Sequence, residues 1–251
     1  MTIKGVFLDF GFVIGYPTAG IERKYFYLDW DGIDTILKKQ DLTQHLRPGV
    51  GRAELAAFFE REIYNVVVEH EQTDAVAPQT NTLLLNKLHL VLNCPINQLV
   101  VDKLLAHLDT MKYITIDAQA VEVVAELKRR GFWLALVSNM MLPGKLLRAK
   151  LQQANILAYF DTVTISSDVG FIKPHPEIFR LTLRQSELRP DEVVFVGDTY
   201  QQDIIGAKRV GLKTAWLNNR HEPRAAAVGN PPDYEIETLV ELLEKPILST
   251  G

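Results

Sequence analysis

Four short apolar runs of this chain each end in a polar side chain suited to phosphate chemistry. In chain order the polar residues are Asp9, Ser138, Lys173 and Asp198, with Asn139 and Asp203 close behind two of them. A carboxylate can attack phosphorus or bind a hard cation, and a hydroxyl or a lysine can contact phosphoryl oxygens. One such residue at a strand end is common, whereas this combination indicates phosphoryl chemistry.

The elements that must position these residues follow from the apolar pattern. Residues 4–10 predict a buried strand that ends at Asp9, and Gly11, Gly15, Pro17 and Gly20 then predict a loop. From residue 117 helices and strands alternate: helices are predicted at 117–130, 143–154, 175–185, 201–210 and 237–244, and strands at 132–137, 162–166, 193–197, 213–217 and 234–236. This alternation predicts an α/β fold, a Rossmann-like doubly wound parallel sheet with both faces covered.

In such a sheet, ligands bind beyond the carboxyl ends of the strands. Asp9, Ser138 and Asp198 are all predicted at strand carboxyl ends, so we expect them to share one cleft. Residues 21–110 show helical spacing and no convincing strand, which predicts a separate helical block. Residues 218–232 have the composition of a surface loop.

The bulk composition excludes several classes of function. The 251 residues carry a net charge of −4, and the longest basic run is Lys128-Arg129-Arg130, which argues against nucleic-acid binding. No apolar run is long enough to span a membrane, and the N-terminus does not resemble a signal peptide. The single cysteine, Cys94, excludes an intramolecular disulfide. We therefore expect a cytoplasmic protein without a nucleic-acid or membrane partner.

Two segments carry a resemblance to a known family. They are Lys173-Pro174-His175-Pro176-Glu177-Ile178-Phe179 and Gly197-Asp198-Thr199-Tyr200-Gln201-Gln202-Asp203. Together with Asp9 and Ser138, they make the chain resemble the haloacid dehalogenase-like superfamily, whose members are mostly phosphatases, over roughly residues 3–15 and 115–245. The resemblance implies a core domain of residues 1–16 and 112–251, with an inserted all-α cap domain of residues 17–111.

The resemblance also implies a role for each residue. Asp9 would be the nucleophile that forms an aspartyl-phosphate, and Ser138, Asn139 and Lys173 would bind the phosphoryl group, with Ser138 and Lys173 counted as catalytic. The metal ligands would be Asp9, the backbone carbonyl of Gly11, Asp198 and Asp203, and the cofactor would be Mg²⁺. The expected function is a magnesium-dependent phosphatase that acts on a small phosphorylated metabolite.

Gly11 departs from the family pattern, which usually has a second aspartate two residues after the nucleophile. That aspartate protonates the leaving oxygen and then activates water, and Phe12 and Val13 also replace the usual Gly and Thr. Losing this general acid–base group typically costs about 10²–10⁴-fold in rate. Other side chains that can carry a proton are Tyr16, His45, His175 and Tyr200, but the sequence does not place any of them near the leaving group.

Three alternatives remain open at this point. A non-catalytic member would bind a phosphorylated ligand or a protein partner, and Gly11 motivates this interpretation. A 2-haloacid dehalogenase would also lack the second aspartate, but the family's dehalogenases lack the metal acid that Asp198 provides here. A phosphonate hydrolase would need a cap lysine, for which Lys24, Lys38, Lys39 and Lys87 are available.

Overall fold

The structure is a computed structural model that describes most of the predicted core and part of the helical block. The described residues are 2–18, 30–39, 41–55, 57–58, 61, 87–94, 97, 99, 111, 114–140, 143–219 and 230–248. Within them, six strands form one parallel sheet in the order β5-β4-β1-β6-β7-β8. Their bounds are β1 Gly5–Leu8, β4 Trp133–Ser138, β5 Thr162–Ile165, β6 Val193–Gly197, β7 Lys213–Leu217 and β8 Tyr234–Ile236.

The sheet register brings the predicted polar residues to one edge. Leu8, the last residue of β1, is aligned with Leu136 of β4 and with Val196 of β6. The residues that follow these positions, including Asp9, Ser138 and Asp198, therefore leave the sheet at the same carboxyl edge. The three strand ends lie side by side, because β4, β1 and β6 are neighbours in the sheet.

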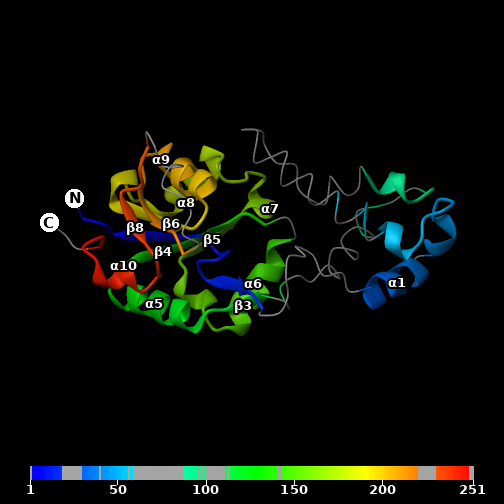
Figure 1. The fold of residues 1–251 in the computed structure, drawn as a ribbon, viewed down its shortest axis with the longest axis horizontal. Helices are drawn as coiled ribbons and strands as arrows, with labels where there is room; N and C mark the ends of the chain where they lie inside the picture. The colour runs from blue at the N-terminus through cyan, green and yellow to red at the C-terminus, as the bar shows by residue number, and fades with distance from the viewer. Residues whose placement is uncertain are drawn as a thin grey trace.

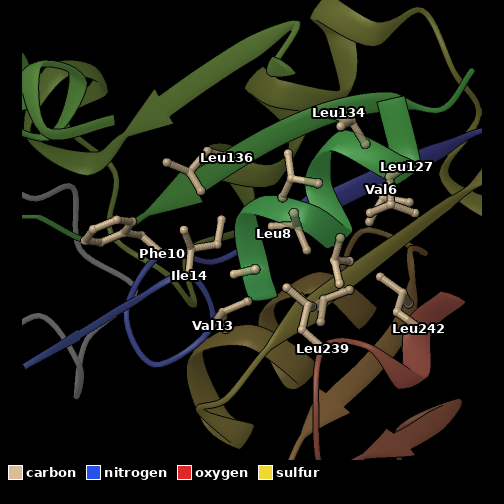
Figure 2. Close-up of a cluster of buried hydrophobic side chains, with 14 of the residues drawn as sticks. Val6, Leu8, Phe10, Val13, Ile14, Leu127, Leu134, Leu136, Leu239 and Leu242 are labelled. Atoms are coloured by element: carbon tan, nitrogen blue, oxygen red, sulfur yellow. The ribbon is translucent and has the colours of Figure 1, made fainter. Parts of the chain in front are cut away.

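Alternate residues of the central strands pack on opposite faces of the sheet, because side chains of a strand alternate in direction. Val6 and Leu8 belong to one apolar cluster, which includes residues of α5 (Ala118–Arg129), α6 (Gly144–Gln153) and α10 (Glu241–Glu244) and is shown in Figure 2. Phe7 belongs to the cluster on the other face, with residues of α8 (Pro176–Ser186) and α9 (Gly206–Lys208). Figure 1 shows helices on both sides of the sheet, which confirms the predicted doubly wound α/β fold.

The remaining described elements are short. They are α7 Ser166–Val169, the 3₁₀ turns η1 Thr43–His45, η2 Leu88–Leu90, η4 Leu157–Tyr159 and η5 Pro190–Glu192, and the π-helical turn η6 Tyr200–Ile205. The helix predicted at 201–210 is thus a π-helical turn that continues into α9. The helix predicted at 237–244 is shorter, because α10 covers only its last four residues.

A small two-stranded antiparallel sheet corrects the loop prediction for residues 11–20. Strand β2 (Gly15–Pro17) pairs antiparallel with β3 (Ile114–Ile116), and Tyr16 is aligned with Thr115. Glycine and proline are depleted in strands, so the composition of β2 hides it. Its partner lies about a hundred residues further along the chain, so no local turn pattern announces the pairing.

Helix α1 (Trp30–Lys39) stands apart from the six-stranded sheet in Figure 1, together with the turns near it. Much of the predicted helical block, including Lys24, lies outside the described residues, so the domain boundaries stay a prediction. Lys38 and Lys39 lie in the last turn of α1. No helix among the described residues is both long and apolar enough to cross a membrane.

Candidate active site

Three buried carboxylates meet at the carboxyl edge of the sheet. Asp9 follows β1, Asp198 follows β6, and Asp203 lies in η6, and these residues are 8%, 4% and 0% exposed. Each offers a carboxylate oxygen within 4.8 Å of the others. The amide of Asp9 donates to the carbonyl of Val196 at 2.9 Å, which ties the start of its loop to β6.

Lys173 crosslinks two of these carboxylates. Its Nζ lies 2.7 Å from Oδ1 of Asp9 and 2.7 Å from Oδ1 of Asp203, and the residue is 1% exposed. The second oxygen of Asp203 accepts a hydrogen bond of 2.9 Å from the amide of Thr199. Both oxygens of Asp203 are therefore engaged by the protein, and these contacts suit it to holding Lys173.

The close approach of Asp203 requires glycine at position 197. A Cβ on Gly197 would lie 2.3 Å from Cγ of Asp203, a separation that real side chains do not reach. The last residue of β6 must therefore lack a side chain for η6 to fold back over the strand end. The segment Gly197-Asp198 then supplies both the space and the neighbouring carboxylate.

The electrostatics of the cluster favour a bound cation. Burial raises the pKa of Asp9 to about 7; the charge of Lys173 opposes the rise, and those of Asp203 and Asp198 add to it. Burial lowers the pKa of Lys173, but the charges of Asp203 and Asp9 outweigh it and leave that pKa raised. One lysine therefore faces three buried carboxylates, and such an excess of hard oxygen donors fits a divalent ion such as Mg²⁺.

Asn139 has a positioning role that the sequence did not predict. Its Nδ2 donates to the carbonyl of Lys173 at 3.0 Å, and its Oδ1 accepts from the amide of Lys173 at 2.8 Å. These two bonds fix the backbone that carries the lysine to the end of β4. Ser138, which ends β4, is 3% exposed, and its hydroxyl donates a long bond of 3.4 Å to the carbonyl of Asn139. Their predicted contacts with substrate stay predictions.

Gly11 lies in a tight turn that leaves space beside it. A Cβ at this position would meet no atom within 4 Å. The turn is closed by bonds from the amide of Phe12 to the carbonyl of Gly15 at 2.8 Å, and from the amide of Gly15 to the carbonyl of Phe10 at 2.9 Å. The position where the family usually has a second aspartate is thus open space near the cluster.

The four candidate proton carriers have different surroundings. His175 caps α8, because its Nδ1 accepts from the amide of Glu177 at 3.1 Å. Tyr200 donates to the carbonyl of Asn230 at 2.5 Å, and His45 lies in η1 of the helical block. Tyr16 differs from them, because it lies on β2 immediately after the turn that contains Gly11.

Asn219 is a second residue that sequence reasoning missed. Its Nδ2 donates to the carbonyl of Phe12 at 3.1 Å and to the hydroxyl of Tyr16 at 3.5 Å. It lies in the segment predicted as a surface loop, of which residues 220–229 lie outside the described residues. Because it follows the carboxyl end of β7, the strand-end rule that selected Asp198 could have selected it too.

The site is thus a cluster of carboxylates bridged by a lysine at the carboxyl edge of a parallel α/β sheet. Residues 54–217 match the model of the family described as haloacid dehalogenase-like hydrolase. The chain belongs to this family, which confirms the resemblance noted from the motifs.

Among curated relatives, phosphoserine phosphatase of Thermus thermophilus is 35% identical over 124 residues, which are 49% of this chain and 48% of that protein. Pyrophosphatase PpaX of Bacillus cereus is 34% identical over 128 residues, which are 51% of this chain and 57% of that protein. The match thus spans about half the length of these relatives.

Solved structures match almost the whole chain. A HAD phosphatase from Thermococcus onnurineus has a TM-score of 0.61 at 26% identity, over 98% of each chain. A 2-haloacid dehalogenase from Pseudomonas syringae has a TM-score of 0.60 at 19% identity, over 96% of this chain and 97% of that one. At that lower identity the dehalogenase shares the fold, and the choice of chemistry depends on the site.

Proposed function

We propose that this protein is a magnesium-dependent phosphatase that hydrolyses small phosphorylated metabolites through an aspartyl-phosphate on Asp9. The observation that carries the proposal is the buried position of Lys173 between Asp9 and Asp203, beside Asp198. A cation held at a carboxylate nucleophile can neutralise an incoming phosphoryl group. The names of the two curated relatives support this class, since both describe enzymes that cleave phosphate esters or anhydrides.

The residues divide the work as follows. Asp9 attacks phosphorus, the bond to the leaving oxygen breaks, and water then hydrolyses the aspartyl-phosphate in a second displacement. Lys173 binds a phosphoryl oxygen while Asp203 and Asn139 hold it in place. Ser138 contributes its hydroxyl from the end of β4. Mg²⁺, held by Asp9, Asp198 and the carbonyl of Gly11, would reduce the repulsion between the anionic nucleophile and its anionic substrate.

The carboxylate cluster favours this function over dehalogenation. A carbon–halogen bond is broken in a substrate with a single carboxylate, and no cation is needed to bring it to the nucleophile. Three buried acids around one lysine would repel such a substrate unless a divalent ion balanced them. The same cluster argues against a protein that only binds a ligand. Burying the charge of Asp9 costs folding free energy, and that cost is expected where the carboxylate acts as a nucleophile.

The open space at Gly11 favours leaving groups that need little protonation. Aryl and acyl phosphates release weakly basic oxygens, so they depend less on a general acid than alkyl phosphates do. We therefore expect aryl phosphates to be better substrates than sugar phosphates. A steep preference for sugar phosphates would contradict this expectation.

The test is hydrolysis of 4-nitrophenyl phosphate with and without Mg²⁺, using the Asp9→Asn variant beside the parent. Turnover should require Mg²⁺ and fall by at least about 10⁴-fold in Asp9→Asn, because the nucleophile is lost. The Asp191→Asn variant, which changes an acid of η5 that pairs with Arg189, is the matched control and should retain activity. Metal-independent chloride release from a 2-haloacid would overturn the proposal, and so would a folded parent that binds Mg²⁺ without hydrolysing any phosphate.

A further inference from the structure

Tyr16 and Asn219 border the turn that replaces the missing acid. Tyr16 follows Gly15, whose carbonyl accepts from Phe12, and Gly11 forms a bridge with Gly15. Tyr16 is therefore close in space to Gly11, where a Cβ would meet no atom within 4 Å apart from its chain neighbours. Asn219, which follows β7, contacts the same turn by donating to the carbonyl of Phe12.

The hydrogen bonds here leave one donor and one acceptor unused. Nδ2 of Asn219 donates to the Tyr16 hydroxyl, so the phenolic oxygen is the acceptor in that bond and its own hydrogen points elsewhere. No acceptor for that hydrogen is recorded among the residues that the structure describes. Oδ1 of Asn219 is buried and has no hydrogen-bond partner in this part of the chain. Buried polar atoms normally have partners, so the Asn219 oxygen indicates a missing hydrogen-bond donor, and the half-buried Tyr16 hydroxyl beside it has a hydrogen to offer.

The surroundings keep Tyr16 protonated. Burial raises its pKa, and the negative charges of Asp117 and Asp198 raise it further, against a lowering by Asn219. Tyr16 is therefore a neutral hydrogen-bond donor at ordinary pH. It reaches this end of the molecule because β2 begins directly after the turn that follows Asp9.

Phe12 supplies an apolar wall for the same space. It has a φ of 53°, a left-handed conformation that is unfavourable for a bulky side chain. Its ring is 37% exposed and lies edge-on to the Tyr16 ring at a centroid distance of 6.1 Å. Strained residues with exposed apolar rings often mark functional sites, because the structure around them must hold them in place.

We propose that Tyr16, Asn219 and Phe12 form the leaving-group subsite, in which Tyr16 hydrogen-bonds the leaving oxygen and Phe12 contacts its aryl or other flat apolar substituent. The inference rests on the proposed phosphatase function. As Asp9 bonds to phosphorus, the leaving oxygen takes the electron pair of the broken bond and accepts the Tyr16 hydrogen bond. Solvent water supplies the proton that completes the alcohol, which then donates to Oδ1 of Asn219.

The test compares Tyr16→Phe with the parent on aryl phosphates whose phenols differ in basicity. A hydrogen bond to an oxygen that gains charge is charge-assisted, so it matters more as the leaving oxygen becomes more basic. We expect kcat/KM to fall by about 2-fold for the most acidic phenol and about 10- to 100-fold for unsubstituted phenol. Tyr159→Phe, which alters a half-buried tyrosine of η4 outside the site, is the matched control and should give parental values for the whole series.

Two further measurements separate the possible failures. In the Asp9→Asn background, calorimetry with Mg²⁺ should show that phenyl phosphate binds more tightly than inorganic phosphate, and that Tyr16→Phe or Asn219→Ala reduces this difference. An equal loss for every leaving group in Tyr16→Phe, with the parent active, would overturn the subsite and leave the phosphatase intact. If inorganic phosphate does not bind and the parent is inactive, the proposed function fails and this inference falls with it.

Discussion

The two sides of the candidate active site are built differently. On the sheet side, charged residues are buried and bound to one another, as in the Lys173 contacts with Asp9 and Asp203. On the turn side, the residues are neutral, and within the part of the chain that the structure describes Oδ1 of Asn219 is buried without a hydrogen-bond partner. The comparison suggests that the sheet side determines the reaction and that the turn side determines the leaving group.

The difference follows from the free-energy cost of burying charged groups on one side and neutral polar groups on the other. A buried charge without a partner costs several kcal/mol, so Lys173, Asp9 and Asp203 must satisfy one another before a substrate arrives. A neutral hydroxyl or amide costs about 1–3 kcal/mol when unsatisfied, and a substrate can compensate for that on binding. A substitution on the turn side should therefore cost less stability than one that breaks the Lys173 contacts.

Among the variants that compare the two sides, the largest effect should come from Lys173→Met, which removes the charge while keeping the length of the side chain. The expected loss is about 10³-fold in kcat/KM, because the developing charge on the phosphoryl group loses its nearest cation. The free energy of unfolding should fall by about 3–5 kcal/mol, because Asp203 is left buried without its partner. Phosphatase assays and denaturant unfolding measure the two losses.

A surface ion pair provides the matched control for Lys173→Met. Lys128 lies 2.7 Å from Asp161, but both side chains are partly exposed. Lys128→Met should therefore cost less than about 1 kcal/mol and leave activity unchanged. If both variants lowered the free energy of unfolding equally, the buried contacts of Lys173 would be no stronger than a surface ion pair, and the two sides of the site would not differ in this way.

The next effect should come from Gly11→Asp, which adds an acid to the turn side. Position 11 has room for a Cβ and does not have a left-handed backbone, so aspartate fits without strain. We expect hydrolysis of alkyl phosphates to rise by about 10²-fold, because the new carboxyl can protonate the leaving oxygen. The rates for aryl phosphates should change less, and steady-state kinetics on both classes measures the difference.

Gly11→Asn is the matched control, because it has the same shape and no acid. It should not accelerate hydrolysis of alkyl phosphates. A gain in both variants would assign the effect to packing in the turn. An unchanged or lower rate in a folded Gly11→Asp protein that still binds Mg²⁺ would show that the missing acid does not limit the reaction.

The sequence predicted the sheet side of the site better than the turn side. Asp9 and Asp198 could be selected because each follows a short apolar run, and the strand predicted at 193–197 coincides with β6. By contrast, the contact of Asn219 with Phe12 joins residues that are 207 positions apart. No periodic pattern reports such a contact, since it depends on how β7 lies in the finished sheet.

The role of Asn139 shows the same limit within the sheet side. Its residue type and its place after β4 predict a phosphate contact, which stays a prediction, while the structure adds that its side-chain amide binds the backbone of Lys173. The sequence indicates which polar residues reach the carboxyl edge of the sheet. It does not indicate how they share hydrogen bonds there, because that depends on the path of the loop that carries Lys173.

A third effect concerns the pH dependence of Mg²⁺ binding on the sheet side. Burial raises the pKa of Asp9 from 3.8 to about 7, so the metal must displace a proton below that pH. Mg²⁺ affinity should therefore rise with pH, by up to about tenfold per unit between pH 5 and 7, and level off above. Calorimetry in buffers of different ionisation enthalpy should detect the released proton.

The raised pKa of Asp9 also determines how the stability of the metal-free protein changes with pH. Because the folded pKa of Asp9 lies above its unfolded value of 3.8, its contribution to the stability of the metal-free protein is full below 3.8 and is lost as pH rises to about 7. Asp9→Asn should abolish both the proton release and this loss, whereas Tyr16→Phe should preserve them. Metal affinity that is constant from pH 5 to 7 would contradict the burial argument.

The smallest effect on stability should come from Phe12→Gly on the turn side. Glycine removes a left-handed strain of about 1–2 kcal/mol, but it also loses the edge contact with Tyr16 and makes the unfolded chain more flexible. These contributions nearly cancel, so the free energy of unfolding should change by less than about 1 kcal/mol. The preference for aryl over alkyl phosphates should nevertheless fall by about 5- to 10-fold, because the apolar wall is lost. A loss of more than about 3 kcal/mol in denaturant unfolding would mean that Phe12 is part of the core, and the two sides would then not differ as argued.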